Sequence, residues 1–489
     1  MVASKVSVLS RKFDSDKAYL WESTGVDGYQ IKEATKDTIG TIITLTLKEG
    51  SEYDSFLEEY KLRSIVKKYS DYISYPITMM VTHEHKKHTE EETLNSMVPL
   101  WKKDKKDIKD SDYQQFYHDK FFDYEDSIKV IHSSVEGKCT YTTLLYIPSH
   151  ASYDFYSKEY EKGLQLYANG VLIMDKCKEL LPDYFSFVKG LVDTSDLSLN
   201  ISREMLQQDK NLGLIASNIE KKIKKELETM LKEERDNYEK FFKAFGMQLK
   251  FGIYNSYGMK KEELADLLMF TSSKDKKMIT LKEYVSNMKE NQDKIYYACG
   301  ETVDKIDMLP QVEQLKDKGY VVLYLTDYID EFVMQVMNNY DGKNFVNASS
   351  GEVDLDTKEE KEELTKKNEE YKDIFKVMKD TLKDNITDVR FTHRLKNHPV
   401  CLVSEGNVSI EMEKVMNAMP TDDKVKANTI LEINENHEIS KKLEKLYQSD
   451  KQELEKYTKV LYAQARLIEG LPIENPTEIS NLVCEILSK

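Results

Sequence analysis

An apolar stripe at helical spacing is the feature that most restricts how this chain can fold. Its members recur every three or four residues, at Leu212, Ile215, Ile219, Ile223, Leu227 and Met230. This spacing places all of them on one face of a long amphipathic helix. Such a face must be buried against a sheet or other helices, so the stripe predicts a packed domain on both sides of it in the sequence.

The segment Leu197 to Gln208 comes directly before this helix and is predicted to be a loop that turns into a helix. Asn200 and Ser202 are good N-cap residues. Arg203 and Gln207 are four residues apart, so they project from one face near the helix start. An arginine there opposes the helix dipole, and its guanidinium matches phosphate oxygens, which suits a loop that holds an anion. The alternative is a solvated surface arginine.

Other patterns predict a multidomain chain of the α+β and α/β type. Four short strands predict an antiparallel sheet with one buried face at the start, from Lys5–Ser10, Ala18–Glu22, Tyr29–Glu33 and the alternating Ile43, Leu45 and Leu47. Four strands with no helix make an incomplete domain. The run Val321–Leu325 predicts a buried strand of an α/β unit. Further helices are predicted at Asp236–Phe251, Lys260–Phe270, Thr280–Asn291 and, as one charged and solvated helix, Glu359–Lys383.

The composition excludes several classes of partner. The chain has 489 residues and a formal charge of −16, so it repels nucleic acid phosphates and anionic membranes. No apolar run reaches membrane-spanning length, and the N-terminus is too poor in apolar residues for a signal peptide. The five cysteines are far apart and form no CxxC pair. Reduced thiols in the cytoplasm are therefore expected, with no disulfide framework.

Two amphipathic helices are predicted at the C-terminal end. Leu454, Tyr457, Leu461, Ala465 and Ile468 line one face of the first. Asn475 and Pro476 then mark a helix start, and its stripe is formed by Ile479, Leu482, Val483, Ile486 and Leu487. Such helices pack on one another or on a partner chain, and the pattern leaves both arrangements open.

A methionine-containing stripe and a histidine cluster are the remaining candidate sites. Val408, Met412, Val415 and Met416 share one face of a short helix, which suits either promiscuous apolar contact or an ordinary core. His83, Glu84, His85 and His88 have metal-ligand spacing, but they stand among charged residues of an expected loop. We expect a solvated loop and no metal site there. The chain has no P-loop lysine motif, Gly-x-Ser-x-Gly or HExxH.

The arginine segment resembles a known motif. Leu199-Asn200-Ile201-Ser202-Arg203-Glu204-Met205-Leu206-Gln207 is similar to the catalytic loop of heat-shock protein 90 chaperones, and of the bacterial HtpG type in particular. Further motifs follow in the family's order: Trp21-Glu22-Ser23, Gly40-Thr41, Lys67-Lys68-Tyr69-Ser70-Asp71, Tyr75-Pro76-Ile77, Pro99-Leu100-Trp101, Ile329-Asp330-Glu331, His393-Arg394-Leu395 and Leu431-Glu432-Ile433-Asn434-Glu435-Asn436-His437. The resemblance covers essentially the whole chain. The short linker Lys48–Ser55 fits the bacterial type.

The resemblance implies three domains. Residues 1–50 would be the last part of an N-terminal ATPase domain, 53–345 a middle domain with the catalytic arginine loop, and 357–489 a mostly helical dimerisation domain. The family's glycine-rich phosphate loop, the acidic residue that activates water and the aspartate that reads adenine have no counterparts here. We therefore expect an N-terminally truncated chain. Gly40-Thr41 matches the family's threonine at the adenine pocket.

By resemblance, Arg203 contacts the terminal phosphate of ATP, which is bound with Mg²⁺ in the full-length family member. Gln207 is the polar residue beside it, and Asn200 shapes the loop. None of the three is a general base. The family's base belongs to the segment that has no counterpart here.

The resemblance also implies client binding and dimer formation. Phe332 stands where bacterial relatives carry a client-contacting tryptophan, and Val408, Met412, Val415 and Met416 match a helix that contacts unfolded clients. The C-terminal helices would form a homodimer through Leu454, Leu461, Ile479, Leu482 and Ile486.

Three functions follow from these expectations. The first is an ATP-dependent molecular chaperone that binds unfolded or partly folded clients and couples ATP hydrolysis to closure of a dimeric clamp. The second is an ATP-independent dimeric module that holds clients, because most of the nucleotide pocket has no counterpart here. We expect this chain alone neither to bind nor to hydrolyse ATP. A plain helical scaffold is the third.

Overall fold

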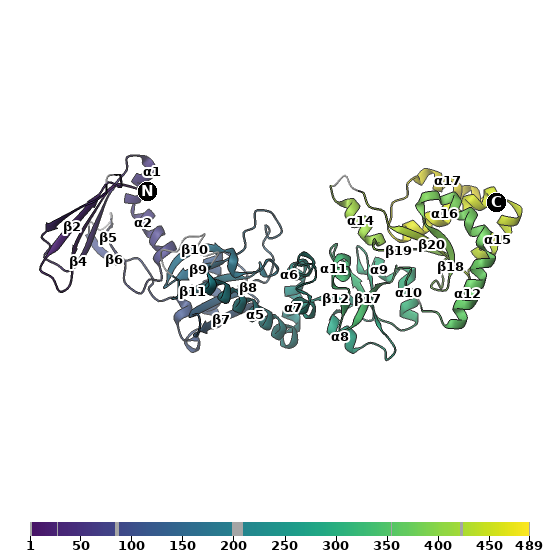
Figure 1. The fold of residues 1–489 in the computed structure, drawn as a ribbon, viewed down its shortest axis with the longest axis horizontal. Coiled ribbons are helices and arrows are strands. Elements are labelled where there is room, and N and C mark those ends of the chain that lie inside the picture. Colours follow the sequence, from purple (N-terminus) through teal and green to yellow (C-terminus); the bar gives the residue numbers. More distant parts are fainter. Residues whose placement is uncertain are drawn as a thin grey trace.

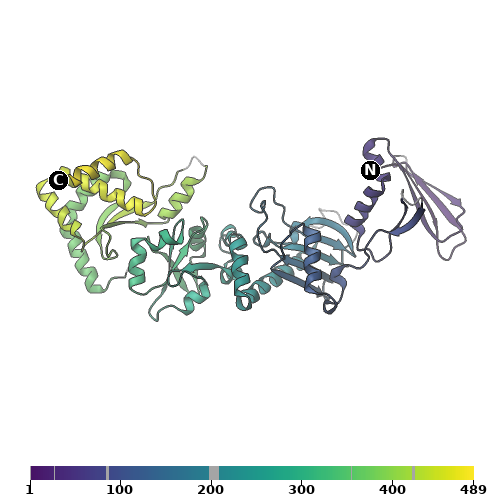
Figure 2. The ribbon, with the colours of Figure 1, turned by 180° about the vertical axis from the view of Figure 1, so that it is seen from behind.

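The computed structural model describes residues 2–26, 28–83, 88–197, 209–353, 355–420 and 424–488. Figures 1 and 2 show an elongated chain, with an N-terminal sheet at one end and helices α15 to α17 at the other. Mixed helices and sheets form successive units between these ends, which confirms the predicted α+β and α/β fold class. Within the described residues, no helix is both long and apolar enough to cross a membrane.

The N-terminal sheet is antiparallel, as the alternating pattern predicts. Its strand order is β3-β2-β1-β4, and the strands are β1 Ala3–Arg11, β2 Ala18–Ser23, β3 Gln30–Ala34 and β4 Gly40–Leu47. The central strand β1 pairs Val8 with Trp21 on one side and with Ile43 on the other. The predicted buried face is wrong for β4, because Ile42, Ile43 and Leu45 are at least half exposed and keep apolar side chains at the surface of this sheet.

A helical connection leads from this sheet into the next unit. It consists of α1 Ser51–Asp54, the 3-10 turn η1 Ser55–Leu57, α2 Glu59–Ile65 and the π-helical turn η2 Val66–Ser70. The hairpin β5 Thr78–His83 and β6 His88–Thr93 follows it.

The next sheet has the order β10-β9-β11-β8-β7 and is covered on both faces. Its strands are β7 Lys129–Val135, β8 Tyr141–Ile147, β9 Leu164–Ala168, β10 Val171–Cys177 and β11 Lys189–Thr194. Alternate side chains of β8 enter different cores: Leu144 and Tyr146 join Trp101 and α3 Asp110–Phe121, whereas Leu145 and Ile147 join the core under α5 and α6. This division follows from the two-residue period of a strand.

Helix α5 Lys210–Glu233 confirms the predicted stripe. All six residues of the stripe from Leu212 to Met230 are buried. Asp209 caps the helix, since its side chain accepts a hydrogen bond from the Leu212 backbone N–H at 2.9 Å. Helix α6 Arg235–Asn255 packs against α5 and completes this core.

A six-stranded sheet forms the following α/β unit, with the order β13-β12-β15-β14-β17-β16. Its strands are β12 Met269–Ser272, β13 Met278–Thr280, β14 Lys294–Cys299, β15 Val322–Leu325, β16 Asn339–Tyr340 and β17 Lys343–Asn347. Its helices and 3-10 turn are α7 Lys261–Leu264, η7 Ala265–Leu267, α8 Leu281–Ser286, α9 Val303–Asp307, α10 Pro310–Asp317 and α11 Asp330–Met337. The predicted strand at 321–325 is confirmed as β15, which is fully buried and runs parallel to β14.

Two predicted helices of this unit are wrong in part. The segment Lys260–Phe270 begins as α7 but ends in β12, because Met269 and Phe270 pair with Thr280 and Ile279 of β13. The segment 280–291 is helical only as α8, where Thr280 and Glu283 form a capping box at the start.

The C-terminal unit combines a three-stranded sheet with six helices among the described residues. Its sheet has the order β18-β20-β19, from β18 Asp388–Thr392, β19 Val400–Glu405 and β20 Asn428–Asn434. Its helices are α12 Lys358–Glu370, α13 Lys372–Leu382, α14 Ile410–Ala418, α15 Glu438–Ser449, α16 Lys451–Ile468 and α17 Pro476–Leu487. The single helix predicted over Glu359–Lys383 is wrong, because Tyr371 leaves helical geometry and separates α12 from α13.

Candidate functional site

The predicted arginine loop lies outside the described residues. Asn200, Arg203 and Gln207 all fall within 198–208, so the structure gives no position for their side chains. The described chain on either side of the loop is well fixed. β11 ends before it, and α5 begins directly after it.

A buried carboxylate holds the strand that enters the loop. Asp193 of β11 is 4% exposed. It accepts hydrogen bonds from the Trp101 indole N–H at 3.0 Å and from the Gly170 backbone N–H at 3.2 Å, and it pairs with Lys102 at 2.9 Å. A carboxylate with this many donors in a buried setting fixes the strand end firmly.

Two shorter hydrogen bonds hold the end of β11 and the residues between it and the loop. The Thr194 hydroxyl donates to the Thr140 carbonyl at 2.8 Å, and the Thr140 backbone N–H donates to Asp196 at 2.6 Å. On the far side, Asp209 caps α5. The partial positive charge at the α5 N-terminus therefore lies directly after the loop, where it favours an anion.

The predicted adenine-pocket residues lie in the N-terminal sheet. Gly40 and Thr41 begin β4, and both are exposed. The hydroxyls of Thr41 and Ser10 share a hydrogen bond of 2.8 Å. Figure 1 shows the N-terminal sheet, which contains β4, at one end of the chain and apart from the sheet that contains β11.

Helix α11, which carries Phe332, contacts α14, which carries Met412, Val415 and Met416. Phe332 lies on α11 and is half-buried, with its ring edge-on to Tyr254 at 6.0 Å between centroids. Gln335, one turn further along α11, donates to the Asn407 carbonyl at 3.0 Å and contacts the Met412 sulfur at 2.9 Å. Helix α14 is thereby held against α11.

The face of α14 is only partly covered. Met412 is buried at 9% exposure, whereas Val408, Val415 and Met416 are half-buried. The loop after α6, which approaches Val336 of α11 at Gly258, leaves Tyr257 and Met259 largely exposed. We use the name α11–α14 surface for Phe332 together with Val408, Met412, Val415, Met416, Tyr257 and Met259. Its partial exposure distinguishes it from the cores of the neighbouring units.

The terminal helices divide into a buried and an exposed one, and this corrects part of the predicted dimer interface. Leu454 and Leu461 of α16 are 0% and 4% exposed within the chain's own core, so they are not available to a partner. Helix α17 has no buried residue, and Ile479, Leu482 and Ile486 remain half-exposed. It is held on α16 by the ion pairs Lys456–Glu485 and Lys459–Glu478.

The histidine cluster is only partly described. His83 and His88 are paired residues at the end of the β5–β6 hairpin, and Glu84 and His85 lie outside the described residues. Where the structure describes side chains, it groups no three histidine, cysteine or acidic residues in a metal-holding arrangement.

Comparisons with known proteins identify the family. The family model described as "Hsp90 protein" matches residues 55–93 and 83–489. The chain belongs to the Hsp90 family. It is 53% identical to the "Chaperone protein HtpG" of Clostridium perfringens (strain 13 / Type A) and 51% identical to that of Bacillus subtilis (strain 168). Each alignment covers 100% of this chain and 80% of the relative. These relatives support a molecular chaperone function of the HtpG type.

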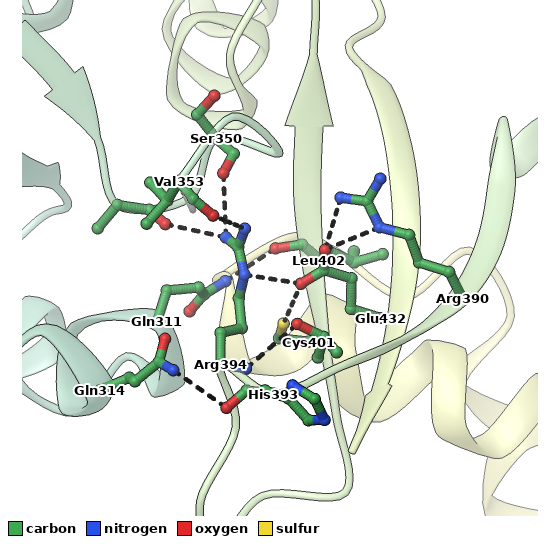
Figure 3. Close-up of polar contacts among 12 residues, drawn as sticks. Gln311, Gln314, Ser350, Val353, Arg390, His393, Arg394, Cys401, Leu402 and Glu432 are labelled. Carbon is green, nitrogen blue, oxygen red and sulfur yellow. Dashed lines mark hydrogen bonds and ion pairs between the residues drawn. The ribbon is translucent and has the colours of Figure 1, made fainter. Parts of the chain in front are cut away.

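A buried ionic junction of this Hsp90-family chain connects the α/β unit to the C-terminal unit (Figure 3). Arg394, 7% exposed, pairs with Glu432 at 2.9 Å and donates to the carbonyls of Ser350 and Val353 at 3.0 and 2.9 Å. Arg390 approaches the other oxygen of Glu432 at 2.7 Å. Arg394 and Glu432 both lie in motifs that the sequence shares with the family. Residues this far apart in the sequence give no indication that their side chains form an ion pair.

A second buried carboxylate lies in the same junction. Gln311 of α10 donates to the Leu402 carbonyl at 2.8 Å and to Glu469 at 2.6 Å. Burial raises the pKa of Glu469 to about 7, and Glu411 acts in the same direction, while Gln311 and Lys414 oppose both. The Gln311 side-chain oxygen has no hydrogen-bond partner in the described chain. Sequence reasoning missed this pair, which is 158 residues apart.

Proposed function

We propose that this chain is an ATP-dependent chaperone that binds unfolded or partly folded proteins on its α11–α14 surface and couples ATP hydrolysis to closure of a homodimeric clamp. The observation that carries client binding is the partly exposed face of α14, held against α11, the helix that also carries Phe332. Relatives that match over the whole chain are named as chaperones. Residues 1–50 are proposed as the C-terminal part of an ATPase domain, 53–345 as the middle domain and 357–489 as the dimerisation domain.

The chemistry of the α11–α14 surface suits unfolded chains. Methionine is flexible and polarizable, so Met416 and Met259 adapt to different apolar side chains. Tyr257 and Phe332 add aromatic area beside them. Unfolded clients present such apolar segments in no fixed pattern, which favours an adaptable surface over a shaped pocket.

ATP coupling is proposed through the loop at 198–208. Arg203 would stabilise charge that develops on the terminal phosphate of ATP, with Gln207 beside it and Asn200 shaping the loop. The fixed ends at Asp193 and Asp209 support this proposal, because a guanidinium must be held in place to act on a transition state. Gly40 and Thr41 would contact the nucleotide, and ATP would carry Mg²⁺.

The alternative is an ATP-independent module that holds clients. It is favoured by the exposure of Thr41 on a sheet that lies apart from the sheet that contains β11. Suppression of client aggregation is measured with and without ATP, in the wild-type chain and in Arg203→Ala. An effect of ATP that Arg203→Ala abolishes supports the coupled mechanism. Equal protection in all four conditions supports the alternative.

Replacing Val415 and Met416 together by serine is expected to weaken client binding. Each truncation of a partly exposed apolar contact should cost about 1 kcal/mol, or roughly fivefold in affinity. Aggregation of a chemically denatured client, followed by light scattering, gives the measurement. Met308→Ser is the matched control, because Met308 is 68% exposed and lies outside this surface. Equal protection by both variants would place client binding elsewhere.

Leu482→Glu is expected to dissociate a homodimer formed through α17. A buried carboxylate without a partner is costly, so the added charge should lower the affinity of the dimer at least tenfold. A tenfold change corresponds to about 1.4 kcal/mol of binding free energy. Sedimentation velocity of the full chain measures the change. Asn481→Glu adds the same charge at an exposed position beside the stripe and should leave the assembly intact. Two variants that sediment alike would contradict the α17 interface.

The unpaired cysteines favour a reducing compartment, and we propose the cytoplasm. Nucleic acid and membranes are not proposed as partners, since the net charge of −16 opposes both.

A further inference from the structure

A pocket of about 670 Å³ lies where η2 meets strands β10, β9 and β11 of the middle sheet, at the edge formed by β10. Its size falls in the range of sites that hold a small organic molecule. Apolar walls come from four elements or loops, through Phe121 at the end of α3, Tyr160, Leu172 of β10 and Val188. Figure 1 shows α2, which continues into η2, leading to this sheet at β10. The pocket therefore has a sheet floor and a helical rim.

The rim is strongly cationic. Five lysines line the pocket, and only two carboxylates do, so its lining carries a surplus of three positive charges; the residues are Lys67, Lys68, Lys120, Lys176 and Lys189 against Asp119 and Asp175. The whole chain carries −16. A local surplus of the opposite sign attracts anions to this place.

The two aspartates do not neutralise the lysines directly. Asp119 accepts a hydrogen bond from Gln115 at 2.9 Å, and Asp175 accepts one from Gln165 at 2.7 Å. Lys67 and Lys189 have other partners, Asp71 at 2.9 Å and Asp123 at 3.3 Å. In the parts of the chain with described side chains, Lys68, Lys120 and Lys176 have no carboxylate within the 4.0 Å of an ion pair.

Lys120 is the most confined of these three lysines. Its ammonium donates to the Tyr167 hydroxyl at 3.0 Å and lies 5.7 Å from the ring centroids of Tyr72 and Tyr167. These neutral groups stabilise a cation only partly. Burial lowers the pKa of Lys120, whereas Asp175 and Asp71 act in the opposite direction from beyond contact. A bound anion would offset the cost of keeping this charge out of water.

We propose that this pocket binds a small organic anion with an apolar body, of the alkyl- or arylcarboxylate class. The carboxylate meets Lys120, flanked by Lys68 and Lys176, and the apolar body lies on Phe121, Leu172 and Val188. Because η2 and the sheet both line the pocket, the ligand links the helical connection to the middle sheet.

The test is calorimetric titration of the full chain with decanoate, compared with decanol. Decanoate is expected to bind with one site per chain, more weakly at high salt, and decanol at least about tenfold more weakly. Lys120→Met keeps the apolar stem and should lower decanoate affinity about tenfold. The double variant Lys68→Ala/Lys176→Ala changes only exposed side chains and should also weaken decanoate binding. Because these changes should not impair folding, weaker binding would result from the loss of positive charge.

Lys178→Met is the matched control. Lys178 follows β10 directly but does not line the pocket, and its side chain is 56% exposed. Decanoate should bind this variant as it binds the wild type, and it should slow hydrogen exchange of the η2 amides. Absence of decanoate binding overturns the proposal. So does binding that Lys120→Met and the double variant leave unchanged, since it would belong to other apolar surfaces.

Discussion

Glu432→Gln is expected to destabilise the C-terminal unit by about 3 kcal/mol, because it removes the one negative charge between two guanidinium groups. Glu432 is 1% exposed and pairs with Arg394 at 2.9 Å and with Arg390 at 2.7 Å (Figure 3). Glutamine has nearly the same shape, so packing is kept while the charge is lost. The buried Arg394 would then have only neutral acceptors as partners, namely backbone carbonyls and the glutamine amide oxygen.

Native-state hydrogen exchange of the β20 amides measures this loss. The variant should also expose the amides of 348–353, because Arg394 holds the carbonyls of that segment. Glu405→Gln is the matched control, since Glu405 faces the same Arg390 at 3.6 Å with a side chain that is 51% exposed. An exposed pair contributes at most about 1 kcal/mol. Equal exchange in the two variants would contradict the role of Glu432.

Sequence patterns predicted elements whose burial follows a simple period. The six stripe residues of α5 have such a period and are buried, and α5 is where the pattern places it. The alternating strands β1 and β4 are also where the pattern places them, but Ile43 and Leu45 of β4 stay at least half exposed. A buried segment gives a weaker signal: Met269 and Phe270 continue an apolar run from α7, yet strand pairing with β13 determines their conformation. A short apolar run does not distinguish helix from strand.

The predictions of candidate sites differ in outcome for a similar reason. The stripe at Leu454 and Leu461 and the stripe at Leu482 and Ile486 look alike in sequence, but the first packs into the chain's own core and the second remains half-exposed. Periodicity shows that a face is apolar and does not show what covers it. The Gln311–Glu469 pair and the Lys120 pocket carry no periodic signal, because they are formed by segments that meet only in the folded chain.

Glu469→Gln is expected to stabilise the C-terminal unit at about pH 8 and to have little effect at about pH 4. Burial raises the pKa of Glu469 from 4.5 to about 7 in the folded chain, so the folded state prefers the protonated carboxyl. The contribution of the protonated Glu469 carboxyl to the free energy of unfolding is therefore complete below pH 4.5, and it is lost as the pH rises to about 7. At about 1.4 kcal/mol per pKa unit, the loss is roughly 3 kcal/mol at most.

Glutamine at position 469 avoids this loss, because it stays neutral and still offers an oxygen to Gln311. Its amide can also donate to the Gln311 oxygen that lacks a partner. Hydrogen exchange of the β19 amides, compared with the wild type at the same pH, measures the difference. The exposed Glu474→Gln should change stability little at either pH. A variant that is less stable than the wild type by the same amount at both pH values would contradict this prediction. That result would show that Glu469 is ionised at both pH values and is a charged partner of Lys414.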